Sequence, residues 1–260
     1  MIQREFHAFL AAVLFFTRLP GIVLDDEYAK DAFSQASRYF PLIGWMVGTM
    51  GAGAFWAASL ILPFPLAILL SICATILVTG ALHEDGFADV CDGFGAGWNK
   101  EQILAIMKDS YIGVYGVIGL ILMLGFKLLC LVSLRPLLLP IVMISGHALS
   151  RFASISLMFS YEYARNNDES SKAKAVVRKL SVNELLFAAI CGLFPFFLLA
   201  LLTREWRLFG IGIAVVWLTR ALCGQYFFHK IGGYTGDCLG AVQQITEVVF
   251  YAMVVATMQW

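Results

Sequence analysis

The chain has 260 residues, of which 60% are hydrophobic and 14% are charged, and its mean hydropathy is +0.80. An ordinary soluble domain cannot bury this much apolar surface in one core, so the composition predicts a protein that folds in a lipid bilayer. The 18 basic and 18 acidic residues cancel, which argues against a nucleic-acid partner attracted by bulk charge.

The first apolar stretch, residues 6–16, is followed by the sequence TRLP. It is too short to cross a bilayer, and no small-residue cleavage site follows it, so a secretory signal is not indicated. We expect an amphipathic or re-entrant segment that remains part of the protein.

Seven later stretches approach the length of about 20 apolar residues that a transmembrane helix needs. They are residues 40–62, 66–82, 112–132, 137–159, 185–202, 208–228 and 245–258. The expected fold class is therefore all-α: a polytopic integral membrane helical bundle of about seven transmembrane helices. Its single domain, 1–260, would also include the N-terminal segment and interfacial helices on one face.

The basic residues are distributed unequally between the two sides of this bundle. Threading the spans in order places the N-terminal segment and residues 82–111, 160–184 and 229–242 on one side. That side holds 12 of the 18 Lys and Arg residues, and the opposite turns hold three. The positive-inside rule makes it the cytoplasmic side. The opposite turns are short, so we expect an active site on the cytoplasmic face. The basic loop 165–179 is either a solvated connector or a clamp for phosphate or anionic lipid.

An acidic cluster follows the second span. If residues 83–92 are helical, Asp85, Asp89 and Asp92 fall within a ~60° sector of the helix surface. Neighbouring carboxylates repel each other, and no Lys or Arg occurs from His83 to Trp98. Such oxygen ligands favour Mg²⁺, or else Mn²⁺, with water and substrate phosphate completing the shell. The alternative is a solvated acidic helix end.

The residues after this cluster offer further polar groups. The glycine-rich residues 93–97 (GFGAG) are predicted to break the helix, and a new helix is expected at residues 99–107. Lys108 and Ser110 are candidate phosphate contacts and Asp109 a further carboxylate; the alternative is an interfacial helix with ordinary flanking charges. His83 is a candidate base, or a structural histidine.

A second candidate segment lies between the sixth and seventh spans, on the same side as the acids. Its glycines suggest a backbone nest for phosphate, although a glycine-rich turn alone is a weak signal. The candidate phosphate contacts here are Lys230, Gly233, Thr235 and Gly236. Asp237 is a candidate ligand or base.

Three ionisable residues are candidates in or near the spans. Glu247 lies inside the seventh span, where a charged group is functional by default. Arg151, four residues after His147, and Arg38 either pair with a carboxylate or contact phosphate. Intramembrane charges also permit a transporter, but transport sites usually lie near the bilayer midplane, whereas the acids cluster at the cytoplasmic boundary.

Five segments, in order along the chain, resemble motifs of the cobalamin synthase (adenosylcobinamide-GDP ribazoletransferase) family. Residues 82–93 resemble its signature HLDGLADTxDG. The others are residues 16–20 (FxTRLP in the family), 38–44 (FPLIG), 106–113 (IMRDSRxG) and 232–241 (GGxTGDxLGA). Glu84, Lys108 and Tyr111 depart from the family pattern. Lysine in place of arginine weakens bidentate phosphate binding, but the acids are intact.

The resemblance implies a reaction at the bacterial inner membrane. The adenosylcobinamide-phosphate moiety of adenosylcobinamide-GDP is transferred to α-ribazole or its 5′-phosphate, giving adenosylcobalamin or its 5′-phosphate, and GMP. Mg²⁺ on the three aspartates would bridge the pyrophosphate. Asp109, Asp237 or His83 would accept the proton of the attacking hydroxyl, and Lys108, Arg151 and Lys230 would contact phosphate.

The resemblance also indicates the partners: the two substrates and the lipid bilayer, with no nucleic acid. It leaves open a homo-oligomer and association with other enzymes of corrinoid assembly. A related class, the CDP-alcohol phosphotransferases, needs DGxxAR with two later aspartates. Here Asp89 and Val90 stand where Ala and Arg belong, and residues 93–99 contain no acid.

Overall fold

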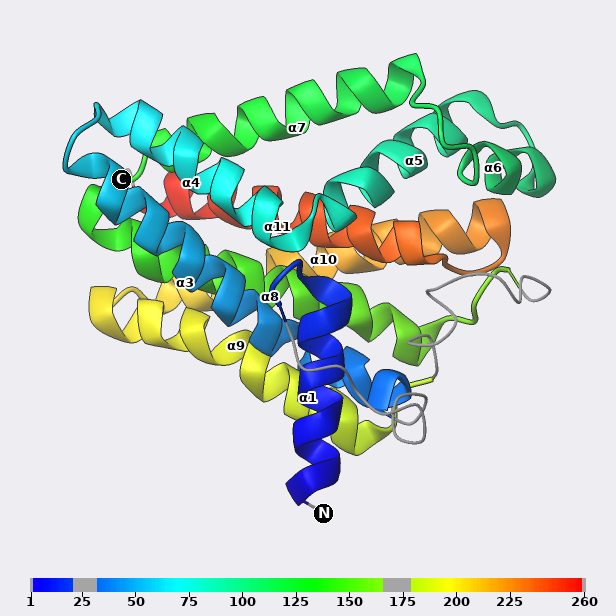
Figure 1. Cartoon of the computed structure of the whole chain (residues 1–260), viewed down its shortest axis with the longest axis horizontal. Coiled ribbons are helices and arrows are strands. Elements are labelled where there is room, and N and C mark those ends of the chain that lie inside the picture. Colours follow the sequence, from blue (N-terminus) through cyan, green and yellow to red (C-terminus); the bar gives the residue numbers. More distant parts are fainter. Residues whose placement is uncertain (1, 21–31, 166–178, 259–260) are drawn as a thin grey trace.

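The computed structural model describes residues 2–20, 32–165 and 179–258, and within them the secondary structure is helical. The elements are α1 (Ile2–Phe16), η1 (Ser37–Tyr39), α3 (Phe40–Ser59), α4 (Phe64–Thr79), α5 (Leu82–Ala96), α6 (Lys100–Ile106), α7 (Val114–Val132), η2 (Pro136–Leu138), α8 (Leu139–Ser160), α9 (Val182–Thr203), α10 (Trp206–Ile231) and α11 (Gly236–Met258). The long helices run roughly along the long axis of the molecule, and α1 crosses them (Figure 1).

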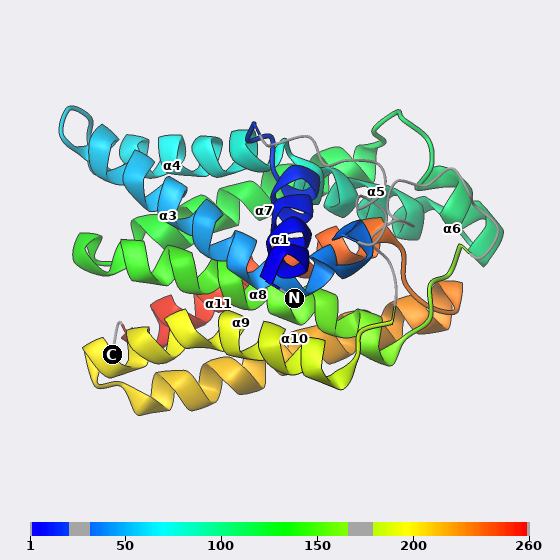
Figure 2. The ribbon, with the colours of Figure 1, turned by 60° about the horizontal axis from the view of Figure 1, so that its bottom comes forward.

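The described part of the chain confirms the polytopic bundle. Six helical stretches are long and apolar enough to cross a membrane, and α4 with α5, bent by 89°, makes a seventh span or a re-entrant pair. The predicted N-terminal segment is α1, which is not among the spans. Figure 2 shows α6 and the end of α10 at one end of the molecule, opposite the turn between α3 and α4.

The helices α8 and α11 form the centre of the bundle. In the span formed by η2 and α8, 78% of the apolar stretch is buried, and in α11 72%, against 28% in α7 and α10. Small residues allow the helices to approach closely, as is usual in membranes. A Cβ on Gly44 of α3 would overlap the backbone carbonyl of His147 on α8, and one on Gly48 would lie 2.7 Å from the Cα of Ile144.

The prediction for the seventh span was wrong at its start. α11 begins at Gly236 rather than near residue 245, so most of the expected loop 229–242 is helical. Thr235 caps α11, because the backbone N–H of Cys238 donates to its hydroxyl at 3.2 Å. The first turns of α11 have a polar sequence, which hid them from a prediction based on hydropathy. Polar residues such as Gln243 face inward there and bond to other side chains.

Residues 93–97 end the helix as predicted, but only at their last residue: α5 continues to Ala96, and Gly97 is its C-cap. These glycines bring neighbouring elements close: a Cβ on Gly93 would overlap the side chain of Met107, and one on Gly95 would lie 2.6 Å from the ring of Tyr115. The next helix begins as predicted. Asn99 caps α6 by accepting a hydrogen bond from the backbone N–H of Gln102 at 2.9 Å.

Candidate active site

The acidic face of α5 packs against the first turn of α11, where Asp237 lies. A Cβ on Gly86 would be only 3.0 Å from the Cα and carbonyl oxygen of Asp237, so the glycine allows this approach. The carboxylate of Asp89 is repelled by those of Asp237 and Asp85 and attracted by Arg165. Asp85 is exposed, and Asp89 and Asp237 are half-buried. Two segments distant in the sequence therefore present a joint negative site.

Arg165 is the cation of this site. Its Nη2 lies 3.2 Å from Oδ2 of Asp237. Backbone pairing holds the segment after α8 in place: the N–H of Tyr234 donates to the carbonyl of Glu162 at 3.1 Å, and the N–H of Ala164 donates to the carbonyl of Tyr234 at 2.8 Å. A Cβ on Gly233 would overlap that Glu162 carbonyl. Gly233, predicted as a phosphate contact, therefore allows the strand-like pairing that positions Arg165.

Thr235, a further predicted phosphate contact, is fully buried and orients Asp237. Besides capping α11, its hydroxyl donates to Oδ2 of Asp237 at 3.3 Å. Gly236 lines the cavity beside the site.

Asp92 has a partner of its own at the start of α7. Its two carboxylate oxygens accept hydrogen bonds from the backbone N–H groups of Gly113 and Gly116, at 2.7 and 2.9 Å. A Cβ on either glycine would overlap this carboxylate. A carboxylate at a helix N-terminus satisfies otherwise unpaired N–H groups. Asp92 therefore has a structural role that its place on the acidic face did not predict.

A cavity of about 590 Å³ opens beside Asp85 and Asp237, between the end of α1 and helices α3, α5, α8 and α11. Arg18, which follows α1, lines it. The backbone N–H of Arg18 bonds to the carbonyl of Val78 at 2.7 Å, and its side chain crosses Gly80, where a Cβ would overlap the guanidinium.

The sequence did not single out Arg18 or Arg165 as site residues. Arg18 belongs to the FTRLP segment, and Arg165 is the first residue of the basic loop 165–179. Residues 166–178 of that loop lie outside the described residues.

His83 also lines this cavity and is almost fully buried. Its ring stacks on Phe40, with 5.3 Å between the centroids and 18° between the planes. Neither ring nitrogen has a hydrogen-bond partner among the residues that the structure describes.

Several predicted contacts lie elsewhere on the surface. Lys108, Asp109 and Ser110 are exposed between α6 and α7, where the carboxylate of Asp109 accepts a hydrogen bond from the N–H of Tyr111 at 3.1 Å. Lys230 is exposed at the end of α10, 6.0 Å above the ring of Tyr226. The described lining of the cavity includes none of these predicted residues.

Arg38 pairs with carboxylates, the alternative that the sequence left open. Its guanidinium lies 2.6 Å from Glu5 of α1 and 3.6 Å from Glu184 of α9. It therefore fastens α1 to the bundle.

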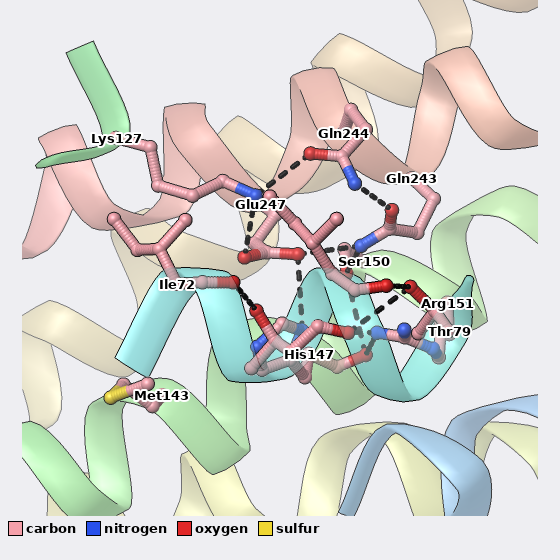
Figure 3. A network of polar contacts seen from close by, with 12 residues as sticks. Ile72, Thr79, Lys127, Met143, His147, Ser150, Arg151, Gln243, Gln244 and Glu247 are labelled. Carbon is pink, nitrogen blue, oxygen red and sulfur yellow. Dashed lines mark hydrogen bonds and ion pairs between the residues drawn. The ribbon is translucent and has the colours of Figure 1, made fainter. Parts of the chain in front are cut away.

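Arg151 and Glu247 belong to a buried polar network, shown in Figure 3. The Glu247 carboxylate lies 3.1 Å from Nζ of Lys127 and 3.2 Å from Nδ1 of His147. Arg151 donates to the backbone carbonyl of His147 at 3.0 Å, which confirms that the two residues share a face of α8. All four side chains are less than a tenth exposed, so their charges are compensated by other groups inside the protein and not by water.

This network continues to α5 through a glutamine. Nζ of Lys127 donates to Oε1 of Gln244 at 2.8 Å, and Nε2 of Gln244 donates to Glu84 at 2.9 Å. Glu84 precedes Asp85 in the sequence but points away from the acidic face, toward this network. The network thus connects α5, α7, α8 and α11 beneath the acidic site.

The acidic site suits a cation that takes few ligands from the protein. In the ranges 2–20, 32–165 and 179–258, no three His, Cys, Asp or Glu side chains are arranged as a complete metal centre. Mg²⁺, however, usually takes only one or two carboxylates and fills its shell with water and substrate phosphate. Asp85 and Asp89 supply such a pair, and their mutual repulsion favours a cation between them.

The apolar spans define the chain as an integral membrane protein, in which carboxylates from two helices meet beside a cavity. Residues 8–255 match the family of cobalamin-5-phosphate synthase. The chain belongs to this family and is a transferase of cobalamin biosynthesis, as the five motifs predicted.

Similar proteins cover nearly the whole chain. A protein of Shewanella frigidimarina is 43% identical, over 97% of this chain and 95% of its own length. One of Leptospira interrogans is 41% identical, over 100% and 98% respectively. One of Shewanella baltica is 42% identical, over 96% and 94%. Each is named adenosylcobinamide-GDP ribazoletransferase. No solved structure shows significant similarity to the chain.

Proposed function

We propose that this chain transfers the adenosylcobinamide-phosphate moiety of adenosylcobinamide-GDP to α-ribazole or α-ribazole 5′-phosphate. A ribazole hydroxyl attacks the phosphorus attached to cobinamide, the P–O bond to GMP breaks, and the products are GMP and adenosylcobalamin or its 5′-phosphate. The names of the relatives support the substrates. The proposed chemistry is inferred from one observation: Asp85 and Asp89 lie close to Asp237 and Arg165.

Asp85 and Asp89 are the proposed ligands of Mg²⁺, for which Mn²⁺ is the alternative. When bound, the cation would offset negative charge on the pyrophosphate and on the departing GMP. Asp92 is left out of the ligand set because both its oxygens accept hydrogen bonds from the backbone of α7.

Asp237 is the proposed proton acceptor for the attacking hydroxyl. Thr235 and Arg165 both contact its Oδ2 and fix its orientation. Asp109, the other carboxylate considered for this task, lies in an exposed turn and does not line the cavity.

Arg165 and Arg18 are the proposed phosphate contacts. A guanidinium can bind phosphate through two parallel hydrogen bonds, and both side chains lie next to the acids or the cavity.

The proposed location is the bacterial inner membrane, with the acidic site facing the cytoplasm. The end of the bundle that carries the site includes Lys100, Lys108, Arg165, Lys179 and Lys230. The opposite end has Arg135, Arg204 and Arg207. This asymmetry follows the positive-inside rule.

The test is an assay of the purified protein in lipid with adenosylcobinamide-GDP, α-ribazole and Mg²⁺. We expect GMP and the corrinoid product in equal amounts, loss of both with a chelator, and recovery when Mg²⁺ is restored. If the inserted protein released no GMP under these conditions, the proposed pair of substrates would be refuted.

The variant Asp89→Asn tests the cation site within the same assay. We expect the rate to fall at least about hundredfold, because the amide removes a charged ligand but preserves the shape of the side chain. Glu101→Gln is the matched control: Glu101 is an exposed acid in the first turn of α6, and its variant should retain the wild-type rate. Full activity of Asp89→Asn would refute the ligand assignment.

A further inference from the structure

Helix α5, which carries Asp85 and Asp89, does not continue straight from α4. The two helices are bent by 89° at a break, where Gly80 and Ala81 both have left-handed backbone conformations. Ala81 is the N-cap of α5, and it makes no side-chain capping bond. α5 therefore begins without the local cap that often fixes the first turn of a helix, and its orientation depends on contacts with other helices.

The contact of α5 with α11 beside the acids is close but smooth. A Cβ added to Gly86 would lie 3.0 Å from the Cα of Asp237, and one added to Gly240 would lie 3.5 Å from the Cα of Gly86. Glycines allow this approach because they have no side chain, and for the same reason they cannot interlock. The contact sets the separation of the two helices but offers little resistance to a rotation of α5 about its axis.

A buried hydrogen bond joins the two helices one turn further along α11. Gln244 follows Gly240 by four residues, so the two lie on one face of α11. Nε2 of Gln244 donates to Oε1 of Glu84 at 2.9 Å, and Glu84 lies in the first turn of α5, next to Asp85. Glu84 and Gln244 are both less than a tenth exposed, so water does not compete for this bond.

The amide of Gln244 has only one orientation that satisfies its neighbours. Its Oε1 accepts a hydrogen bond from Nζ of Lys127 at 2.8 Å, and its Nε2 also donates to Oε1 of Gln243 at 2.9 Å. The reversed amide would direct its donors at the ammonium group and its acceptor at the carboxylate of Glu84. An ammonium group cannot accept and a carboxylate cannot donate, so Gln244 is a fixed partner for Glu84.

We propose that Glu84 is a positioning residue for the cation site: its bond to Gln244 fixes the rotation of α5, and thereby the mutual arrangement of Asp85 and Asp89. The inference rests on the proposed function, in which these two aspartates hold the cation. At the other end of the helix, Asp92 is bonded to the backbone of α7. The two proposed ligands therefore lie between two anchors, one on α11 and one on α7.

Glu84 is also a position at which this chain departs from the family signature, which has leucine there. A leucine side chain can pack against α11, but it cannot accept the hydrogen bond of Gln244. The bond is therefore an addition of this chain to a site whose aspartates match the signature. We expect its loss to weaken the cation site and not to abolish the reaction.

The first test measures cation binding without turnover. Mn²⁺ is titrated into the protein in lipid nanodiscs without substrates, and its binding is followed by electron paramagnetic resonance. Glu84→Leu and Gln244→Met each remove the bond, and each should weaken Mn²⁺ binding about tenfold, as is usual when a group that orients metal ligands is lost. The double variant should lose no more than either single variant, because both remove the same bond.

Two control variants separate positioning from charge and from stability. Glu84→Gln keeps an oxygen that accepts from Gln244. It breaks no other bond, because Oε2 of Glu84 has no partner in the described chain, so it should retain most of the wild-type affinity. Ser150→Ala removes a bond of 3.0 Å from Gln243, which belongs to the same network but joins α8 to α11. It should lower the unfolding midpoint and leave Mn²⁺ binding unchanged.

The rate of GMP release gives a second readout. Because Asp85 and Asp89 remain in Glu84→Leu, raising the Mg²⁺ concentration should restore the rate. The variant should thus differ from wild-type protein in the Mg²⁺ concentration that gives half of the maximal rate, and not in the maximal rate itself. A lower maximal rate at an unchanged half-saturating Mg²⁺ concentration would contradict the positioning role.

Wild-type Mn²⁺ affinity in either Glu84→Leu or Gln244→Met would overturn the inference, so each variant decides even if the other fails to insert. An equal loss in Glu84→Gln would assign the effect to the charge of Glu84 and would overturn it as well.

Failure of this inference is distinguishable from failure of the proposed function. GMP release by wild-type protein, with unchanged Mn²⁺ binding in the variants, would exclude the positioning role and leave the transfer reaction in place. Mn²⁺ binding that depends on Glu84, without GMP release, would support the positioning role and refute the reaction. Wild-type protein that binds no Mn²⁺ would refute the cation site and this inference together.

Discussion

At the scale of single residues, Asp89 and Asp92 lie within one turn of the same helix face but have different surroundings. Asp89 is surrounded mainly by other acids, with Arg165 as the compensating charge. Asp92 accepts two backbone hydrogen bonds at the start of α7. Helical periodicity correctly predicts that the two residues share a face. It does not predict which groups of other helices contact each carboxylate.

This difference predicts opposite effects on stability. Asp92→Asn should destabilise the protein by about 1–2 kcal/mol, because one oxygen is replaced by a donor that faces a backbone N–H. Asp89→Asn, measured without Mg²⁺, should be neutral or stabilising because it removes a repelled charge. Thermal unfolding of both variants in the same detergent checks this. A lower midpoint for Asp89→Asn than for Asp92→Asn would contradict the two roles.

The residues Arg18 and Arg165 show what a sequence cannot provide at this scale. Arg165 reaches Asp237 only because residues 162–164 pair with Tyr234, a contact between segments far apart in the chain. The reverse holds for Arg151, which looked suited to phosphate but is buried against His147. Burial and long-range pairing decide these cases, and neither follows from local spacing.

At the scale of elements, the close packing of α5 on α11 brings the acids together. A Cβ added to Gly86 would lie 3.0 Å from the Cα and the carbonyl oxygen of Asp237 on α11. A Cβ added to Gly240 of α11 would lie 3.2 Å from the carbonyl oxygen of His83 on α5. Gly125 of α7, in contrast, has open space around its Cβ position.

The variant Gly86→Ala should therefore lower the rate by about tenfold or more, because a shift of α5 displaces Asp85 and Asp89 from Asp237. The control Gly125→Ala should leave the rate unchanged and raise stability by about 0.5–1 kcal/mol, since alanine favours the helix. Rates and melting temperatures of the two variants would be compared in lipid. Equal rates would show that the separation of the helices does not limit the reaction.

The elements were predictable wherever apolar length or a local cap defines them. The spans from residues 40–62 to 208–228 correspond to α3, α4, α7, α8, α9 and α10 within a few residues. The helix expected at residues 99–107 is α6, which Asn99 caps. The start of α11 was not predictable from hydropathy, because its inward-facing Gln243 and Gln244 are satisfied by side chains of other elements.

At the scale of the whole molecule, the network around Glu247 joins four helices through charges that are buried together. Lys127 and Glu247 are 4% and 1% exposed, so neither charge can turn to water when its partner is removed. Removing one member of a buried pair is generally much costlier than removing both.

We therefore expect Lys127→Met and Glu247→Gln each to destabilise the protein by about 3–5 kcal/mol. The double variant should recover a substantial part of that loss, because it leaves no uncompensated charge on either helix. Unfolding midpoints of the two single variants and the double variant, in one lipid composition, measure the coupling. Strictly additive losses would show that Lys127 and Glu247 act independently.

The position of Asp237 and Glu247 on α11 has a consequence for biosynthesis. Ribosomes make α11 after the helices that it completes, so during synthesis α5 has Asp85 and Asp89 without Asp237, and α7 has Lys127 without Glu247. A nascent chain that has not yet inserted α11 therefore lacks a finished site and holds an unneutralised lysine among apolar helices. Insertion of one late helix supplies the missing carboxylates to both places, which couples the maturation of the enzyme to the completion of its membrane assembly.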